Sequence, residues 1–359
     1  MKTHKQLYPQ ICEFDNLFRA YRQARRAKRD KRQVYNFEFN LESELLQLQR
    51  ELVTQTYQPG AYTNFRLNDR KRRLISAAPF RDRVVHHALC NLVEPIFEDK
   101  FIFDSYANRK NKGTHRALDR AQEFARRYPY VLQGDIVQCF PSIDHAILRG
   151  LLTRPLADAE TRWLIDRILA SGANIHTRHY VMQWFPDDDL FALQRPRGLP
   201  IGNLTSQFWA NVYLNELDQF VKRELHCAAY VRYVDDFLLF ADDKRVLWEW
   251  QHRIAEFLRT LRLVTHPRKT VIYPVTRGMP FLGWNVFLTH RRLKRDNALD
   301  FTRRFRKQVA ALQQGEITFA DLTLCTRAWI AHAEHGDTRR LRAHIFHVIP
   351  ISTGEVYRA

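Results

Sequence analysis

Two adjacent carboxylates interrupt a stretch of residues that favour β-strands. Asp235-Asp236 follows Tyr233-Val234 and precedes the apolar run 237–240. Strand interiors disfavour Asp, and neighbouring carboxylates repel each other. The pair is therefore expected at a hairpin turn that holds a divalent cation. An ordinary Asp-rich turn is the alternative, and it is the interpretation that fits the acidic runs 187–189 and 242–243, which lack β-rich flanks.

A third carboxylate, Asp135, follows the β-forming residues Tyr130-Val131-Leu132. Adjacent strands lie about 4.8 Å apart, so a carboxylate at the end of a neighbouring strand would face the same ions. Two Mg²⁺ ions about 3.5–4 Å apart can activate a hydroxyl nucleophile and stabilise a leaving pyrophosphate. Mg²⁺ takes few carboxylates and completes its coordination with water and phosphates, which suits this sparse set. We expect two Mg²⁺ ions per site, with Mn²⁺ as a substitute ion.

A large excess of positive charge points to a polyanionic partner. The 359 residues include 57 Lys and Arg against 39 Asp and Glu, which gives a formal charge of +18. Such a surplus causes self-repulsion unless a polyanion neutralises it, and nucleic acid is the expected partner. We expect no membrane association, because no stretch approaches the roughly 20 apolar residues of a span and no apolar signal-peptide core follows the first residues. The five scattered cysteines fit reduced thiols in a cytoplasm.

Five segments resemble, in order, the sequence boxes of reverse transcriptases. They are 135–140 (first metal-binding box), 197–207 (Leu-Pro-Gln-Gly box), 233–236 (Tyr-x-Asp-Asp box), 263–270 (the segment with a lysine) and 281–284 (primer-grip hairpin). The resemblance spans roughly residues 65–345. It implies an RNA-directed DNA polymerase with an α+β right-hand fold, in which an α/β palm bears the carboxylates between fingers and a helical thumb.

The resemblance also assigns catalytic roles to individual residues. Asp135 and Asp235 would coordinate the metals, Asp236 would be a weaker or water-mediated ligand, and the Ile136 carbonyl would add one more. Lys269 would donate a proton to pyrophosphate, and a simply solvated lysine is the alternative.

A basic hairpin is predicted to bind the incoming triphosphate. Residues 62–76 read as two short strands with a cationic tip, where Arg73 is the first choice as phosphate ligand and Lys71 and Arg72 are its rivals. Phosphoryl transfer depends on such positioning and charge stabilisation, although a solvated turn would have the same composition.

The resemblance places four more residues at the nucleotide. Phe140 would lie beneath the ribose and exclude a 2′-hydroxyl, and a plain core Phe is the alternative. Ile201, Gly202 and Gln207 would lie near the nascent base pair.

Two departures from the family pattern narrow the resemblance. Ile201 stands where most reverse transcriptases have Gln, and Gln207 stands where they have Pro. This pattern resembles the enzymes of diversity-generating retroelements, as do the segments 74–77, 105–107, 112–115, 140–144 and 329–333. Those enzymes, from bacterial, phage or archaeal hosts, copy a template RNA with frequent errors at template adenines. They work with a small basic accessory variability protein.

Ile201 suggests a physical reason for low fidelity, because Ile cannot make the hydrogen bond that Gln offers near the base pair. Fewer polar contacts should weaken discrimination against wrong partners. Two alternatives stay open. One is a group II-like or defence-associated reverse transcriptase of ordinary fidelity, and the other is an RNA-binding maturase-like protein with an idle polymerase site.

The C-terminal part is expected to hold the primer and template. Residues 291–307 include eight Arg or Lys, which would contact phosphates unless they form a merely solvated basic helix. Core packing is the safer interpretation for Trp284. The primer and template candidates are Phe281, Gly283, Trp284, Arg291, Arg292, Arg303 and Arg304.

Apolar periodicity and turn signals predict the elements that position these residues. Helices are expected at 38–53, 81–97, 146–170, 204–225 and 244–262, strands at 130–136, 270–275 and 281–288, a strand pair at 230–240, and a helical tail at 291–345. The strands should form a mixed α/β sheet with helices on one face, and 19–33 should form a basic helix face. The predicted parts are 1–88 (basic N-terminal extension and fingers), 89–150 and 196–289 (palm), 151–195 (fingers or connecting segment) and 290–359 (thumb).

Overall fold

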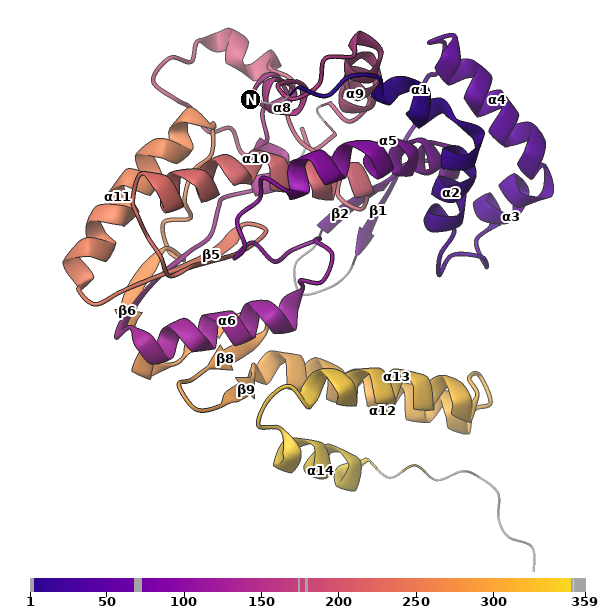
Figure 1. The fold of residues 1–359 in the computed structure, drawn as a ribbon. Coiled ribbons are helices and arrows are strands. Elements are labelled where there is room, and N and C mark those ends of the chain that lie inside the picture. Colours follow the sequence, from indigo (N-terminus) through magenta and orange to yellow (C-terminus); the bar gives the residue numbers. More distant parts are fainter. Residues whose placement is uncertain (1–2, 68–72, 174, 178–179, 350, 352–359) are drawn as a thin grey trace, which may run out of the picture.

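The computed structural model describes residues 3–67, 73–173, 175–177, 180–349 and 351. A group of N-terminal helices, a central antiparallel sheet and a C-terminal group of helices follow one another along the chain (Figure 1). The α+β fold class predicted from the sequence is confirmed. Among the described residues, no helix is long and apolar enough to cross a membrane.

The first three of four N-terminal helices pack against one long helix, α5 (Phe80–Glu98), and the fourth packs against those three. The four are α1 (Leu7–Cys12), α2 (Phe14–Ala24), α3 (Arg32–Phe39) and α4 (Leu41–Val53). The helix predicted over 38–53 is confirmed from Leu41 onward as α4, whose Leu45, Leu48 and Leu52 are buried as their three-and-four spacing requires, whereas residues 38 and 39 belong to α3.

The basic helix face expected over 19–33 is wrong in its extent. Helix α2 ends at Ala24, and Ala27 adopts a positive φ of 57° in the turns that lead to α3. Cations three and four residues apart repel each other along a helix. The turns instead bring Arg25 to Glu38 of α3, where the guanidinium and carboxylate lie 2.7 Å apart.

The hairpin predicted over 62–76 is confirmed as β1 (Thr63–Leu67) paired antiparallel with β2 (Arg73–Ala77). Lys71 and Arg72, which were predicted to bind the triphosphate, lie outside the described residues. Arg73 is the first residue of β2.

The central sheet has the order β4–β5–β3–β6, with every neighbouring pair antiparallel. Its strands are β3 (Tyr130–Gly134), β4 (Tyr230–Tyr233), β5 (Asp236–Ala241) and β6 (Val271–Pro274). The strand pair 230–240 and the strands near 130–136 and 270–275 are thereby confirmed.

Helices cover both faces of this sheet, so the prediction of helices on one face is wrong. Alternate residues of β5 face two different apolar clusters: Leu239 packs in the cluster with α10 (Leu204–Arg223) and α11 (Lys244–Thr260), whereas Leu238 and Phe240 pack in the cluster with α6 (Thr114–Arg127). Because nearly every β5 residue is apolar, both faces must be removed from water.

The helix predicted over 146–170 is two helices. Helix α8 (His145–Thr153) ends just before Pro155, and α9 (Ala159–Ser171) follows. Proline has no backbone N–H to continue the helical hydrogen bonds, so it accounts for the break directly after Arg154. The short helices α7 (Cys139–Ser142) and η1 (Leu190–Gln194) flank this region.

A small three-stranded sheet joins the central four-stranded sheet, which we call the palm sheet, to the C-terminal helices. It consists of β7 (Met279–Phe281), β8 (Trp284–Val286) and β9 (Arg291–Leu293), after the single turn η2 (Val275–Arg277). The single strand expected over 281–288 is therefore split. Leu282 and Gly283 have positive φ angles of 45° and 87° and form the turn between β7 and β8.

The helical tail begins at residue 295 rather than 291, because 291–293 form β9. Helices α12 (Arg295–Gln313), α13 (Phe319–Ala333) and α14 (Arg339–Val348) share an apolar core and form a separate body below α6 in Figure 1. Trp284 lies at the joint and is fully buried, and a Cβ on Gly336, between α13 and α14, would be 2.2 Å from its ring. The core role predicted for Trp284 is confirmed.

Candidate active site

Sheet register brings the three predicted carboxylates to one end of the palm sheet. Gly134 pairs with Phe237, so Asp135 emerges from β3 beside the residue at which β5 begins, Asp236. The fully buried thiol of Cys139 lies close by. Burial raises the pKa of this thiol, and the carboxylates of Asp235 and Asp135 raise it further. Asp135 and Asp235 therefore lie within electrostatic reach of the same buried group.

Asp235 lies on a strained two-residue turn. Tyr233 pairs with Asp236, which leaves only Val234 and Asp235 to connect β4 and β5. Val234 has a φ of 55°. A β-branched residue in this left-handed region is costly, and such strain persists only when the surroundings hold it in place.

Arg232 supports this turn from beneath. Its Nη1 donates to the Val234 carbonyl oxygen at 3.1 Å. Its Nη2 donates to Ser105 Oγ at 3.1 Å, and its backbone N–H donates to the Asp104 carbonyl at 2.9 Å. The arginine thus ties the strained turn to a segment more than one hundred residues earlier in the chain.

A buried carboxylate balances the charge of Arg232. Both side chains of the Arg232–Asp218 pair are 0% exposed, and they form two hydrogen bonds of 2.7 and 2.6 Å. Burial by itself would lower the Arg232 pKa, but Asp218 outweighs this effect and holds the pKa above its ordinary value. Sequence reasoning missed both residues. Their signal was a charge inside the strand 230–233 and an Asp on an apolar helix face.

Lys269 forms an ion pair with the Asp135 carboxylate. The chain before this lysine extends the sheet, because His266 N–H donates to the Asp135 carbonyl at 2.7 Å and Val137 N–H donates to the Val264 carbonyl at 2.8 Å. Ile136 and Thr265 face each other in this antiparallel bridge, so the N–H and C=O groups of Ile136 point away from Thr265. They point to the opposite side of the chain, where β5 begins. The Ile136 carbonyl is thus on the side of Asp235 and Asp236.

The loop before α10 connects the β1–β2 hairpin to the carboxylates. Ser76 N–H of β2 donates to the Ile201 carbonyl at 2.9 Å, and Leu199 N–H donates to the Phe140 carbonyl at 2.9 Å. Gly202 has a φ of 112°, and a Cβ there would lie 2.9 Å from Ile75 Cγ2. The structure therefore brings Phe140, Ile201 and Gly202 to the junction between the hairpin and the palm, and Gln207 follows in the first turn of α10.

Asn203 is a further structural residue that sequence reasoning missed. Its buried side chain accepts a hydrogen bond from Ala78 N–H at 3.1 Å and donates to the Ser76 carbonyl at 2.8 Å. It also donates to the Pro200 carbonyl at 3.2 Å. One amide thus fixes both the end of β2 and the loop that carries Ile201.

The predicted primer and template residues fall into two groups. Phe281 and Trp284 are buried, and a Cβ added at Gly283 would lie 2.6 Å from Asn297. The Arg291 guanidinium donates to Asp119 at 2.7 Å and to Gln122 at 3.0 Å. These contacts favour a structural role for Arg291 in holding β9 against α6. The exposed cations are Arg292, Arg303 and Arg304.

The acidic runs 187–189 and 242–243 were interpreted as ordinary turns, and one of their residues has a different role. Asp189 and Asp243 cap η1 and α11 through their neighbours' N–H groups. The Asp188 side chain is 1% exposed and forms an ion pair with Arg262, so this residue is a buried anchor of the long loop rather than a solvated turn residue.

The converging carboxylates suit a hard divalent cation. Within the described residues, no three His, Cys, Asp or Glu side chains form a ready-made metal cage. Mg²⁺ does not need one, because it keeps several waters and takes substrate phosphates as ligands. Asp135 and Asp235, with the Ile136 carbonyl and Asp236 beside them, could supply the few oxygen ligands that such an ion requires.

Comparison with known proteins places the chain in a family. The reverse transcriptase (RNA-dependent DNA polymerase) family model matches residues 66–286, which contain the carboxylates, the loop before α10 and Lys269. The chain therefore belongs to the reverse transcriptase family.

Among its relatives, the group II intron-encoded protein LtrA of Lactococcus lactis is 24% identical over 282 residues, which cover 61% of this chain and 45% of LtrA. Protein YkfC of Escherichia coli is 27% identical over 283 residues, 67% of this chain and 70% of YkfC. The chain thus spans less than half the length of LtrA. Among solved structures, apo telomerase from Candida tropicalis aligns with a TM-score of 0.45 at 12% identity, covering 66% of this chain and 49% of that one.

Proposed function

We propose that the protein is an RNA-directed DNA polymerase. The observation that carries the proposal is the convergence of Asp135 and Asp235 at one end of the palm sheet, with Asp235 on a strained turn that a buried ion pair supports. Such a turn would not persist without dedicated support. Membership of the reverse transcriptase family supports the same assignment.

Asp135, Asp235 and the Ile136 carbonyl would hold two Mg²⁺ ions, with Asp236 as a weaker ligand. The bound ions supply activation of the primer 3′-hydroxyl and stabilisation of the pyrophosphate. Lys269, which pairs with Asp135, would give a proton to the leaving group.

The chain's own residues orient the remaining substrate groups. Phe140 would pack against the deoxyribose, and the hairpin cations Lys71, Arg72 and Arg73 would neutralise the triphosphate. Ile201 would contact the base pair by shape alone.

Primer extension on a primed RNA template tests the proposal. Asp235→Asn should abolish extension while RNA binding stays within about an order of magnitude, because the basic surface supplies most of that affinity. Asp242→Asn, an exposed acidic residue beyond the end of β5, is the matched control and should extend primers normally. Extension by Asp235→Asn at the wild-type rate would contradict the metal assignment.

At a finer level we propose that synthesis is error-prone at template adenines, as in diversity-generating retroelements. The support is Ile201 and Gln207 in place of Gln and Pro, with Ile201 in a loop that contacts β2 and Gln207 in the first turn of α10. Ile201→Gln should lower misincorporation opposite template adenine when the cDNA is sequenced. Identical error spectra for wild type and variant would refute this reasoning, and low errors in both would favour the group II-like enzyme of ordinary fidelity.

The proposed partners are a template RNA with its primer, deoxynucleoside triphosphates and a small basic accessory variability protein, in the cytoplasm of a bacterial, phage or archaeal host. A maturase-like protein without polymerase activity is the remaining alternative. This alternative is kept because one relative of the chain is named as a group II intron-encoded protein.

A further inference from the structure

Helix α3 exposes two large aromatic side chains on one side. Tyr35 is 63% exposed and Phe39 is 77% exposed. Residues four apart are neighbours on a helix surface, so these rings form one patch rather than two scattered residues. They border a cavity of about 690 Å³ between α3, α4 and the start of α5. Pockets that hold small ligands have volumes of roughly 300–1,000 Å³.

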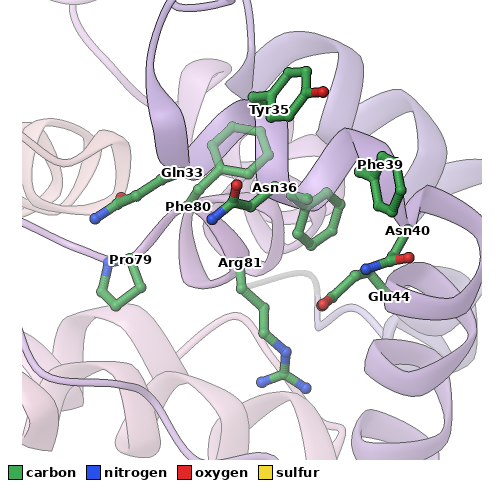
Figure 2. Close-up of a pocket in the computed structure, with 10 residues that line it drawn as sticks. Gln33, Tyr35, Asn36, Phe39, Asn40, Glu44, Pro79, Phe80 and Arg81 are labelled. Carbon is green, nitrogen blue, oxygen red and sulfur yellow. The ribbon is translucent and has the colours of Figure 1, made fainter.

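The cavity combines an aromatic floor with polar amides. Phe37 and Phe80 are buried beneath it, with ring centroids 5.2 Å apart. Within the described part of the chain, none of its three amide side chains has a hydrogen-bond partner. Figure 2 shows them around the cavity: Gln33, Asn36 and Asn40.

These groups match the chemistry of an unstacked nucleobase. Aromatic rings stack on bases, and unpaired bases in RNA are read by stacking together with hydrogen bonds to their edges. Asn and Gln amides offer a donor and an acceptor side by side, which is the pattern that base edges require. An apolar protein segment would leave these amides without partners.

Positively charged side chains lie in the chain next to the cavity. The chain from the end of α2 to the start of α3 carries exposed cations that have no carboxylate within ion-pair distance among the described residues: Arg22, Arg26, Lys28, Arg29 and Arg32. Arg32 is the first residue of α3, so a phosphate backbone on these cations would deliver its bases to Tyr35 and Phe39. Arg81, the cation among the described residues that line the cavity, forms an ion pair with Glu51 at 2.5 Å.

The cavity is separate from the catalytic carboxylates. Figure 1 places α3 beyond the β1–β2 hairpin, at the opposite end of the molecule from α11. We propose that it binds unpaired bases of the template RNA that has not yet been copied. This inference rests on the proposed function, because it takes the RNA to be the template of that polymerase.

Binding of labelled RNA–DNA hybrids to the full-length protein tests the inference. One hybrid is blunt, and the other carries a 5′ RNA overhang of about ten adenosines, within the usual site size of single-strand binding surfaces. The Tyr35→Ala/Phe39→Ala variant should lose about tenfold or more in affinity for the overhang hybrid, as expected for lost base stacking, and should bind the blunt hybrid normally. The Tyr35→Phe/Phe39→Tyr variant keeps both rings and should bind both hybrids like wild type.

Two controls make the result specific. Tyr35→Leu/Phe39→Leu retains apolar surface without a stacking ring, and full affinity of this variant for the overhang hybrid would show that base stacking is not needed and overturn the proposal. Trp248→Ala removes a comparably exposed aromatic ring (59%) from α11 and should change neither affinity.

Equal binding of blunt and overhang hybrids by wild type, or no loss in the Ala variant, would also overturn the inference. Primer extension by the same wild-type preparation reports separately on the proposed function. Failure of extension together with ring-dependent overhang binding would remove the polymerase proposal and leave the cavity as an RNA site.

Discussion

Replacing Arg232 with Met removes the cation that holds the turn of Asp235. The substitution leaves Asp218 with its carboxylate 0% exposed and without its charged partner. Breaking a buried ion pair by removing one partner costs about 3–5 kcal/mol. That is a large share of the roughly 5–15 kcal/mol that stabilises a typical domain.

The effect on catalysis can be separated from the effect on stability. Replacing a buried ion pair by apolar residues of similar size is often nearly neutral, so Arg232→Met/Asp218→Leu should recover most of the lost free energy of unfolding. It cannot restore the hydrogen bond to the Val234 carbonyl, which was 3.1 Å long. A hydrogen bond from a charged group contributes about 1.5–3 kcal/mol, which corresponds to a rate loss of roughly tenfold to a hundredfold.

Two measurements on the same proteins decide between these effects. Urea unfolding measures the free energy of unfolding. Single-turnover primer extension over a range of Mg²⁺ concentrations measures the rate of extension, which depends on how the turn holds Asp235. We expect the double variant to be stable but slow, and to need more Mg²⁺ than wild type, since Asp235 is no longer held in place. A double variant that recovers both stability and wild-type extension would refute a positioning role for Arg232.

Three further predictions concern the nucleotide, the loop before α10 and the buried histidine. Phe140→Ala should admit ribonucleotides, and an unchanged preference for deoxynucleotides in competition assays would place the sugar gate elsewhere. Asn203→Ala should lower the free energy of unfolding by about 1–3 kcal/mol, because it leaves the Ala78 N–H and the Ser76 carbonyl without their partner; urea unfolding at the wild-type value would contradict this. Burial, with the charges of His87 and Arg83, lowers the pKa of His86 to about 3. Below about pH 6.5 the unfolded chain therefore binds a proton at His86 that the folded chain does not bind. The free energy of unfolding should fall by up to about 1.4 kcal/mol per pH unit on acidification. His86→Leu should reduce that slope in urea titrations.

Structural features that depend on residues close together in the sequence could be predicted. The hairpin at Asp235-Asp236 and the strand that ends before Asp135 follow from β-forming flanks and turn residues, and antiparallel pairing then places the carboxylates together. Trp284 could be predicted as a core residue because large aromatics are buried by default. The break in the helix at Pro155 was also visible in the sequence, but the apolar periodicity continued across it.

Features that depend on distant partners could not be predicted. The Arg232–Asp218 pair joins a strand to the helix before it, and nothing in the spacing of these two residues shows that they meet. Arg25 lies just beyond the end of α2 and pairs with Glu38 of α3, and local spacing showed neither that end nor that partner. Arg291 looked like a phosphate ligand because it begins a basic run, yet Asp119 on α6 holds it within the fold.

Template-programmed incorporation of a single nucleotide tests the central claim most directly. Four primed RNA templates that differ only in the first uncopied base would each be offered one deoxynucleoside triphosphate at a time, with and without Mg²⁺. We expect extension only with Mg²⁺ or Mn²⁺ and chiefly with the complementary nucleotide, with relaxed selection where the template base is adenine. Folded protein that binds the primed RNA but adds no nucleotide in either metal would contradict the claim that Asp135 and Asp235 form a working polymerase site.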